Sequence, residues 1–179
     1  MGYSMGARAA LLHALDHPTH WDGLILISAS PGIDDAATRM MRAASDQALA
    51  QQLVRDGVAA FLQQWQQTPM IQSQQRIRAD WQLAMQRNRA QHTASGLATS
   101  LAQFGPAACP NLWPKLHTLS GPTLLITGSQ DRKYCRIAEG MLQQLPQAQG
   151  VCIPNVGHMP HLEAPRASAA AIRSFLSSR

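Results

Sequence analysis

GYSMG at residues 2–6 matches the pattern G-x-S-x-G. This pattern is typical of a sharp turn that carries a serine hydroxyl between a strand and the following helix. The turn is so tight that we expect only small residues at its flanking positions, and the dipole of the following helix favours negative charge near Ser4. Because a five-residue match is weak by itself, a glycine-rich start to an ordinary helix stays open as the alternative.

Two further side chains follow predicted strands later in the chain. GSQD at residues 128–131 places Asp131 just past one apolar run, and NVGH at 155–158 places His158 past the next one. Taken singly, a loop histidine and an aspartate at a helix N-cap are the ordinary interpretations. Together the residues follow the order Ser, Asp, His of the α/β-hydrolase fold, each at a predicted sheet edge. We therefore predict that His158 takes the proton from Ser4 and that Asp131 orients His158.

Composition divides the chain into two kinds of sequence. Residues 1–32 and 119–179 alternate helical patterns with short apolar runs that are typical of buried parallel strands. Residues 33–118 have no strand-like run, hold most of the glutamines, and place apolar residues such as Leu49 and Leu53 at helical spacing. We predict an α/β core formed by the first two segments and an all-helical cap of three or four short helices inserted between them.

The α/β segments predict a small parallel sheet with crossover helices. Strands alternate with helices there, and such an order favours right-handed βαβ units. We expect three parallel strands, at residues 23–29, 122–128 and 150–154. The expected helices cover residues 5–15, 136–145 and 165–176.

Composition also argues against several classes of protein. The chain has 179 residues, 45% of them hydrophobic, which suffices for one domain with a buried core. It has no apolar run of about 18 residues and no signal-peptide pattern, so we expect no membrane span and no secretion. The basic residues that give the chain its net charge of +5 are scattered along the sequence and are not interleaved with aromatic residues. This pattern argues against nucleic-acid binding.

The cysteines and histidines do not form a metal-binding pattern. Cys109, Cys135 and Cys152 are odd in number and lack metal-ligand spacing, which suits a reducing compartment, and we expect a cytoplasmic protein. His158 and His161 have the spacing His-x-x-His, but the sequence places no third ligand beside them. We therefore expect no metal ion.

Several segments carry a resemblance that covers nearly the whole chain. They are GYSMGAR (2–8), SPG (30–32), RAASDQALAQQL (42–53), FLQQWQQTPM (61–70), MQRN (85–88), GLATSLAQFG (96–105), GSQDRK (128–133) and GHMPHLEAP (157–165). With these segments the chain resembles the 2-succinyl-6-hydroxy-2,4-cyclohexadiene-1-carboxylate synthases of menaquinone and phylloquinone biosynthesis. The first and last segments are shared by many hydrolases, whereas the cap pattern is more specific.

The resemblance implies a lyase reaction. The triad abstracts a proton, and pyruvate leaves an enolpyruvyl cyclohexene carboxylate without a metal or organic cofactor. A substrate with several carboxylates needs cations, because burying unpaired charges is costly. Matching the family's segments, the substrate-binding candidates are Arg8, Arg42, Arg87, Lys133 and the aromatic Trp65. The backbone N–H of Met5, the residue after the serine, is the candidate oxyanion-hole donor.

The main departure from the family lies at the beginning of the chain. In the fold, the serine turn follows a central strand that other strands precede, whereas here only Met1 and Gly2 precede Tyr3. We expect the launching strand and the loop with the second oxyanion-hole donor to be absent. Three explanations stay open: a start codon assigned too far downstream, which we favour; a truncated, inactive gene product; or a second chain that supplies the missing half.

Two other functions stay open as alternatives. Another serine hydrolase, such as an esterase or a carbon–carbon bond hydrolase, would share the triad without needing the arginines. A truncated remnant or a binding module would not react with a serine-directed phosphonate. The half-sheet would then expose apolar faces of residues 5–15 and 23–29 for a partner or for self-association. Pro106 and Gln66 depart from the family and affect the expected pocket in detail.

Overall fold

The computed structural model describes residues 1–178, and the chain forms two compact units. The first unit consists of Met1–Pro31 and the residues from Leu112 onward, and the second is Gly32–Asn111. The first unit is built on a parallel four-stranded sheet with the order β1-β2-β3-β4. Its strands are β1 (Gly2–Tyr3), β2 (Leu24–Ile27), β3 (Thr123–Gly128) and β4 (Ala148–Ile153).

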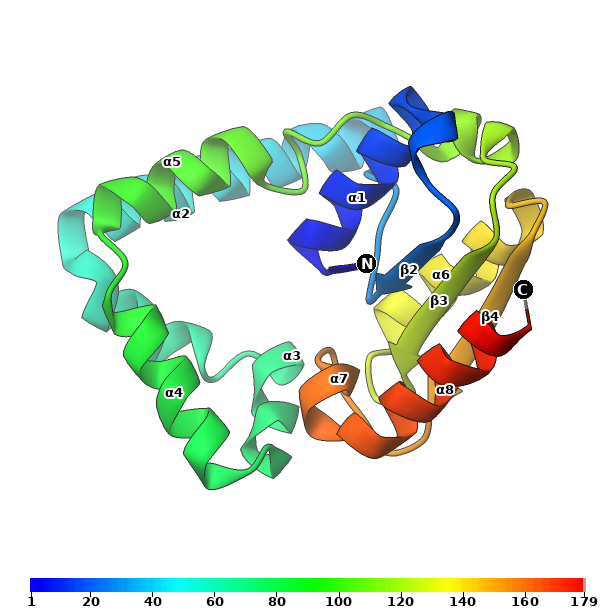
Figure 1. Cartoon of the computed structure of the whole chain (residues 1–179). Helices are drawn as coiled ribbons and strands as arrows, with labels where there is room; N and C mark the ends of the chain where they lie inside the picture. Colours follow the sequence, from blue (N-terminus) through cyan, green and yellow to red (C-terminus); the bar gives the residue numbers. More distant parts are fainter. Residues whose placement is uncertain (179) are drawn as a thin grey trace. The chain divides into compact units, whose positions relative to one another are not determined.

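Helices cover both faces of this sheet (Figure 1). One face packs against α1 (Met5–Asp16), α6 (Arg132–Gln144) and the short 3-10 helix η3 (Trp113–Thr118). The other face packs against α7 (Pro160–Glu163) and α8 (Pro165–Ser177). A 3-10 turn, η1 (Pro18–His20), follows α1. The first unit is therefore a three-layer α/β/α arrangement.

Alternation along the strands supplies both faces of the core. Leu24 and Leu26 of β2 belong to the hydrophobic cluster under α1 and α6, while Ile27 belongs to the cluster under α8. All six residues of β3 are buried. Successive strand residues point to opposite faces, so these unbroken apolar runs pack against the helices on both faces of the sheet.

The sheet differs from the predicted one at its first strand. We expected three strands and no strand before the serine turn. Instead, Gly2 and Tyr3 pair in parallel with Leu26 and Ile27, so a two-residue β1 launches the turn and the sheet has four strands. The helix predicted at 136–145 is also longer, because it begins at Arg132, directly after its N-cap Asp131.

The second unit is helical throughout its described residues. It contains α2 (Ala36–Trp65), α3 (Pro69–Gln72), the 3-10 helix η2 (Ser73–Arg76), α4 (Ala79–Ala90) and α5 (Ala94–Phe104). Figure 1 shows α5 running alongside α2, and the two make extensive contacts. Across residues 1–178, no helix is both long enough and apolar enough to cross a membrane.

The first helix of this unit is longer than we predicted. We expected only short helices, but α2 spans 30 residues with one interruption at Gly57, whose φ is 81° and ψ 169°. Glycine adopts this backbone conformation without the steric penalty that a side chain would impose. The helix therefore tolerates the interruption and continues after Gly57 to Trp65. The second unit ends at Asn111, because Leu112 and Leu116 are buried in the core of the first.

Candidate active site

Ser4 lies at the junction between β1 and α1 in a strained conformation. Its φ is 48° and its ψ is −111°, and its backbone N–H donates to the Ile27 carbonyl at 2.9 Å. A non-glycine residue with such a positive φ costs about 1–3 kcal/mol and is found mainly where the surrounding fold enforces it. Here the pairing of β1 with β2 on one side and α1 on the other enforces it, and the serine stands at the N-terminus of a 12-residue helix.

The glycines on either side of Ser4 are not equivalent. A Cβ on Gly2 would lie 2.7 Å from the Ala7 Cα and would also collide with the Gly6 carbonyl. A Cβ on Gly6 would meet nothing within 4 Å. The expectation that both flanking positions require small residues is therefore right for Gly2 and wrong for Gly6.

A second close approach brings the end of β3 against the loop before His158. A Cβ on Gly128 would lie 2.6 Å from the Val156 carbonyl carbon and would collide with the carbonyl oxygens of Val156 and Gly157. The Gln130 N–H donates to the Val156 carbonyl at 2.8 Å. Glycine at 128 thus lets the two loops touch, and this contact sets the distance between Asp131 and His158.

Ser4, His158 and Asp131 form a chain of hydrogen-bonding contacts. His158 Nε2 lies 3.0 Å from Ser4 Oγ, and His158 Nδ1 lies 2.5 Å from Asp131 Oδ2. Only 3% of the His158 side chain and 10% of the Asp131 side chain are exposed. Asp131 Oδ1 also accepts the Tyr134 N–H at 3.4 Å as the N-cap of α6. The same carboxylate therefore caps α6 and contacts His158.

The loop that carries His158 is held by groups that the sequence did not single out for this task. The Glu163 carboxylate accepts the N–H groups of Gly157 at 2.8 Å and of Met159 at 3.0 Å. The Ser28 hydroxyl donates to the His158 carbonyl at 2.9 Å. These contacts fix the backbone on both sides of the imidazole. Glu163 is the last residue of the four-residue α7, and no spacing pattern in the sequence indicates these bonds.

Aromatic rings surround the imidazole of His158. The ring centroids of Tyr134 and Tyr3 lie 4.5 and 5.5 Å from it, and His161 packs on Tyr3 at 4.6 Å. Burial lowers the pKa of His161, with a smaller opposing effect from Glu163. Among residues 1–178, no His, Cys, Asp or Glu side chains are grouped as a potential metal site.

The remaining candidates of the first unit lie on the two helices that begin at the triad. Arg8 is half-buried on α1, and its backbone N–H donates to the Ser4 carbonyl one turn earlier at 3.2 Å. Met5 is the first residue of α1, a position whose backbone N–H has no partner within the helix. Lys133 is exposed in the first turn of α6, with Nζ 5.9 Å from the centre of the Tyr134 ring.

The candidates Arg42, Trp65 and Arg87 belong to the second unit. Arg42 Nε donates to Asp46 Oδ1 at 2.7 Å, one helical turn along α2. The Trp65 ring carries the Arg89 guanidinium over its face at 4.6 Å. Arg87 is exposed on α4. The arginine that contacts Trp65 is therefore Arg89, a residue that the sequence did not single out.

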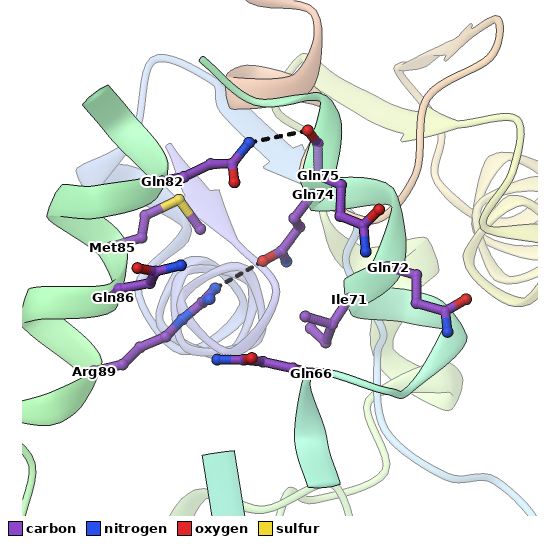
Figure 2. A pocket seen from close by; sticks show the side chains of 9 residues that line it. All are labelled: Gln66, Ile71, Gln72, Gln74, Gln75, Gln82, Met85, Gln86 and Arg89. Carbon is purple, nitrogen blue, oxygen red and sulfur yellow. Dashed lines mark hydrogen bonds between the residues drawn. The ribbon is translucent and has the colours of Figure 1, made fainter. Parts of the chain in front are cut away.

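Arg89 also lines a polar pocket within the second unit (Figure 2). The pocket has a volume of about 110 Å³ and is lined by Gln66, Ile71, Gln72, Gln74, Gln75, Gln82, Met85, Gln86 and Arg89. Arg89 Nη2 donates to Gln74 Oε1 at 2.7 Å, which fixes the orientation of that amide. Gln74 Nε2 is buried without a hydrogen-bond partner among the described residues. The pocket therefore combines a cation with an unsatisfied amide donor.

Comparison with known proteins agrees with this architecture. Residues 1–165 match the sequence family described as the alpha/beta hydrolase fold. The solved structure of MenH from S. aureus superposes on 99% of this chain with a TM-score of 0.94 and 33% sequence identity, and this chain covers 66% of it.

Curated relatives also match nearly the whole of this chain. The 2-succinyl-6-hydroxy-2,4-cyclohexadiene-1-carboxylate synthase of Serratia proteamaculans is 32% identical over 98% of this chain and 66% of its own length. A Bacillus subtilis protein, provisionally named as the same synthase, is 35% identical over 99% of this chain and 65% of its own length. The chain thus spans slightly less than two thirds of these relatives.

Proposed function

The chain belongs to the alpha/beta hydrolase fold family, and from this premise we propose that it is a carbon–oxygen lyase. The proposed reaction eliminates pyruvate from 2-succinyl-5-enolpyruvyl-6-hydroxy-3-cyclohexene-1-carboxylate. Support for this substrate comes from the similarity to proteins named 2-succinyl-6-hydroxy-2,4-cyclohexadiene-1-carboxylate synthase. The proposed catalytic residues are Ser4, His158 and Asp131.

The observation that carries this proposal is the unbroken contact from Asp131 through His158 to Ser4. With Nδ1 held 2.5 Å from a carboxylate, the imidazole keeps Nε2 directed at Ser4 Oγ, 3.0 Å away. His158 can then accept the serine proton, and Asp131 stabilises the imidazolium that results. The strained backbone of Ser4 keeps the hydroxyl at this end of the sheet.

In the proposed reaction Ser4 acts as a base rather than as a nucleophile. As His158 takes the hydroxyl proton, the serine oxygen removes a proton from the substrate ring. A ring carbon–carbon double bond forms, the carbon–oxygen bond to the enolpyruvyl group breaks, and enolpyruvate leaves. The proton on His158 completes the cycle by returning through Ser4 to the leaving group, which tautomerises to pyruvate.

Charge that develops on the substrate needs electrostatic support. We assign the backbone N–H of Met5, at the positive end of the 12-residue helix α1, as one donor to a substrate oxyanion. We assign Arg8 and Lys133 to substrate carboxylates. Arg8 follows Ser4 by one helical turn and Lys133 follows Asp131 by two residues, so both begin near the triad.

The second unit offers further cations for an anionic substrate. Arg42 is held by Asp46, whose second carboxylate oxygen is buried without a partner among the described residues. Arg89 stacks on Trp65 and donates to Gln74. An arginine whose planar group is already oriented loses little freedom when it binds a carboxylate. Of the second unit's residues, Arg42, Trp65 and Arg87 stay the proposed substrate-binding set.

Pyruvate release from the enolpyruvyl substrate tests the proposal. A lactate dehydrogenase coupled assay should detect pyruvate with this chain, and Ser4→Ala should reduce the rate by about 10³-fold or more. Ser45→Ala is the matched control, because Ser45 is exposed on α2 and should leave the rate unchanged.

Two other results would support the alternative functions, a serine hydrolase or a non-catalytic protein. Faster turnover of a neutral aryl ester than of the anionic substrate would identify a serine hydrolase that shares the triad. Absence of both activities, together with no labelling of Ser4 by a serine-directed phosphonate, would identify a non-catalytic protein. Labelling of Ser4 without pyruvate release would keep the triad but reject the lyase proposal.

A further inference from the structure

Two thiols lie in contact outside the triad. Cys135 is in the first turn of α6 and Cys152 is the penultimate residue of β4, and their Sγ atoms are 3.7 Å apart. A disulfide bond holds two sulfurs at about 2.05 Å, so the two sulfurs at 3.7 Å have to approach each other by roughly a further 1.7 Å to form one. The third cysteine, Cys109, belongs to the second unit.

The two thiols have different environments. Cys152 is exposed, whereas Cys135 is half-buried. The Cys135 thiol donates to the Gly128 carbonyl, with Sγ 3.3 Å from that oxygen, and burial raises its pKa. The thiolate is the form that reacts with oxidants. Cys152 is therefore the sulfur that a dissolved oxidant reaches, and Cys135 is held beside it in the protonated state.

We propose that Cys135 and Cys152 are a redox modification site at which hydrogen peroxide forms an intramolecular disulfide. The Cys152 thiolate attacks one peroxide oxygen, the O–O bond breaks, and Cys152 becomes a sulfenic acid while hydroxide leaves as water. The Cys135 sulfur then gives up its proton and attacks the sulfenic sulfur. The S–O bond breaks and a second water leaves. Two thiols lose two electrons in total, and one peroxide becomes two waters.

The contacts of Cys135 connect this modification to the α6 N-terminus. The Gly128 carbonyl that accepts the Cys135 thiol also accepts the Asp131 N–H at 2.9 Å, and the Cys135 N–H donates to the Asp131 carbonyl at 3.0 Å. Oxidation removes the thiol hydrogen bond and ties the first turn of α6 to β4. The new bond also closes the loop from 135 to 152, which restricts the unfolded chain, so the Tm of the oxidised protein should rise by about 5 °C or more.

The test is oxidation of the whole chain with hydrogen peroxide, followed by mass spectrometry. The intact mass should fall by about 2 Da, which is the loss of two hydrogens. Peptide mapping should join the peptides that contain Cys135 and Cys152 and should leave Cys109 open to alkylation. Dithiothreitol should restore the original mass and Tm. Because this readout does not involve turnover, its result is independent of the proposed lyase activity.

Three variants sharpen the test. Cys109→Ser, the matched control, should behave as the unchanged protein does. Cys135→Ser should stop at the sulfenic acid of Cys152, which dimedone traps. Cys152→Ser should show neither the mass loss nor the rise in Tm, and because Cys152 is exposed this variant keeps the test decisive if Cys135→Ser does not fold. Oxygen addition without a crosslink, a disulfide to Cys109, or a crosslink between two chains would overturn the proposal.

Discussion

The two units of this protein differ most in how their regular elements are buried. In the first unit, all six residues of β3 are buried between two layers of helices. In the second unit, neither the 12-residue α4 nor the 11-residue α5 contains a single buried residue. The first unit thus has a core of the kind that long-range strand pairing produces. The second buries a few apolar side chains, Leu53, Ile71 and Ile77, and its helices α4 and α5 make only half-buried contacts.

This difference indicates how rigid each unit is. Most of the stability of a helix in a protein comes from the packing of its apolar face. Elements with few buried apolar contacts open locally at a lower free-energy cost than elements in a core. The first unit therefore supplies the fixed geometry that the proposed proton transfer requires, and the second should open more readily. The following predictions test this division, beginning with the largest expected effect.

The largest effect should come from comparing one N-cap aspartate in each unit. Asp131 caps α6 and also contacts His158, whereas Asp35 caps α2 by accepting the Thr38 N–H at 2.7 Å. Asparagine is also a good N-cap, so both substitutions should keep the helices. Asp131→Asn should lower the rate of pyruvate release by about 10³- to 10⁴-fold, because the imidazole loses its orienting charge. Asp35→Asn should leave the rate unchanged, and equal losses in the two variants would contradict the assignment of Asp131.

A pair of leucines compares the packing of the two units directly. Leu125 of β3 is 2% exposed, whereas Leu97 of α5 is half-buried. Leu125→Ala should reduce the free energy of unfolding by about 2–5 kcal/mol, since it leaves a cavity in a close-packed core. Leu97→Ala should cost only about 1 kcal/mol. Urea denaturation measures both values, and a cost at Leu97 as large as at Leu125 would show that the second unit also has a close-packed core.

The sequence predicted the parts of the fold that have strong local signals. The strand expected at 122–128 is found at Thr123–Gly128, and the helix expected at 165–176 is found at Pro165–Ser177. The positions of Asp131 and His158 at the sheet edge could be predicted because each follows an apolar run, and such runs identify the carboxyl ends of parallel strands. Ser4 has no such run before it and was indicated only by the pattern G-x-S-x-G.

Features that depend on tertiary contacts could not be predicted in this way. β1 has only two residues and exists because it pairs with β2, which leaves no periodic pattern to detect. The contact of Arg89 with Trp65 depends on which side of α4 meets α2. The two hydrogen bonds of Glu163 require a loop conformation that no spacing rule describes.

A smaller effect should follow from weakening the support of the His158 loop. Glu163→Gln keeps the shape of the side chain but removes the charge that strengthens its bonds to the N–H groups of Gly157 and Met159. We expect a loss of about 1–3 kcal/mol in the free energy of unfolding. We also expect a fall in kcat with little change in KM, because both hydrogen bonds of Glu163 go to the backbone on either side of His158. A change in KM alone would assign Glu163 to substrate binding.

The smallest effect concerns the pH dependence that His161 gives to the first unit. Burial lowers the pKa of His161, against the opposing charge of Glu163 and with a further lowering by His158. In the unfolded chain, His161 binds a proton as the pH falls through about 6.5, while in the folded chain it stays neutral to a lower pH. The unfolded state then binds more protons, so this contribution is fully present above the unfolded pKa and is lost as the pH falls below it.

His161→Phe removes this contribution while it keeps an aromatic ring against Tyr3. The Tm of the unchanged protein should therefore fall more between pH 8 and about pH 5.5 than the Tm of His161→Phe does. Glu163→Gln should enlarge the fall, because it removes the negative charge that favours protonation of the folded histidine. His92→Phe is the matched control, since His92 is exposed in the second unit and should leave the pH dependence as it is. If His161→Phe and the unchanged protein lose the same Tm on acidification, His161 titrates alike in the folded and unfolded states, and the acid sensitivity of the first unit has another origin.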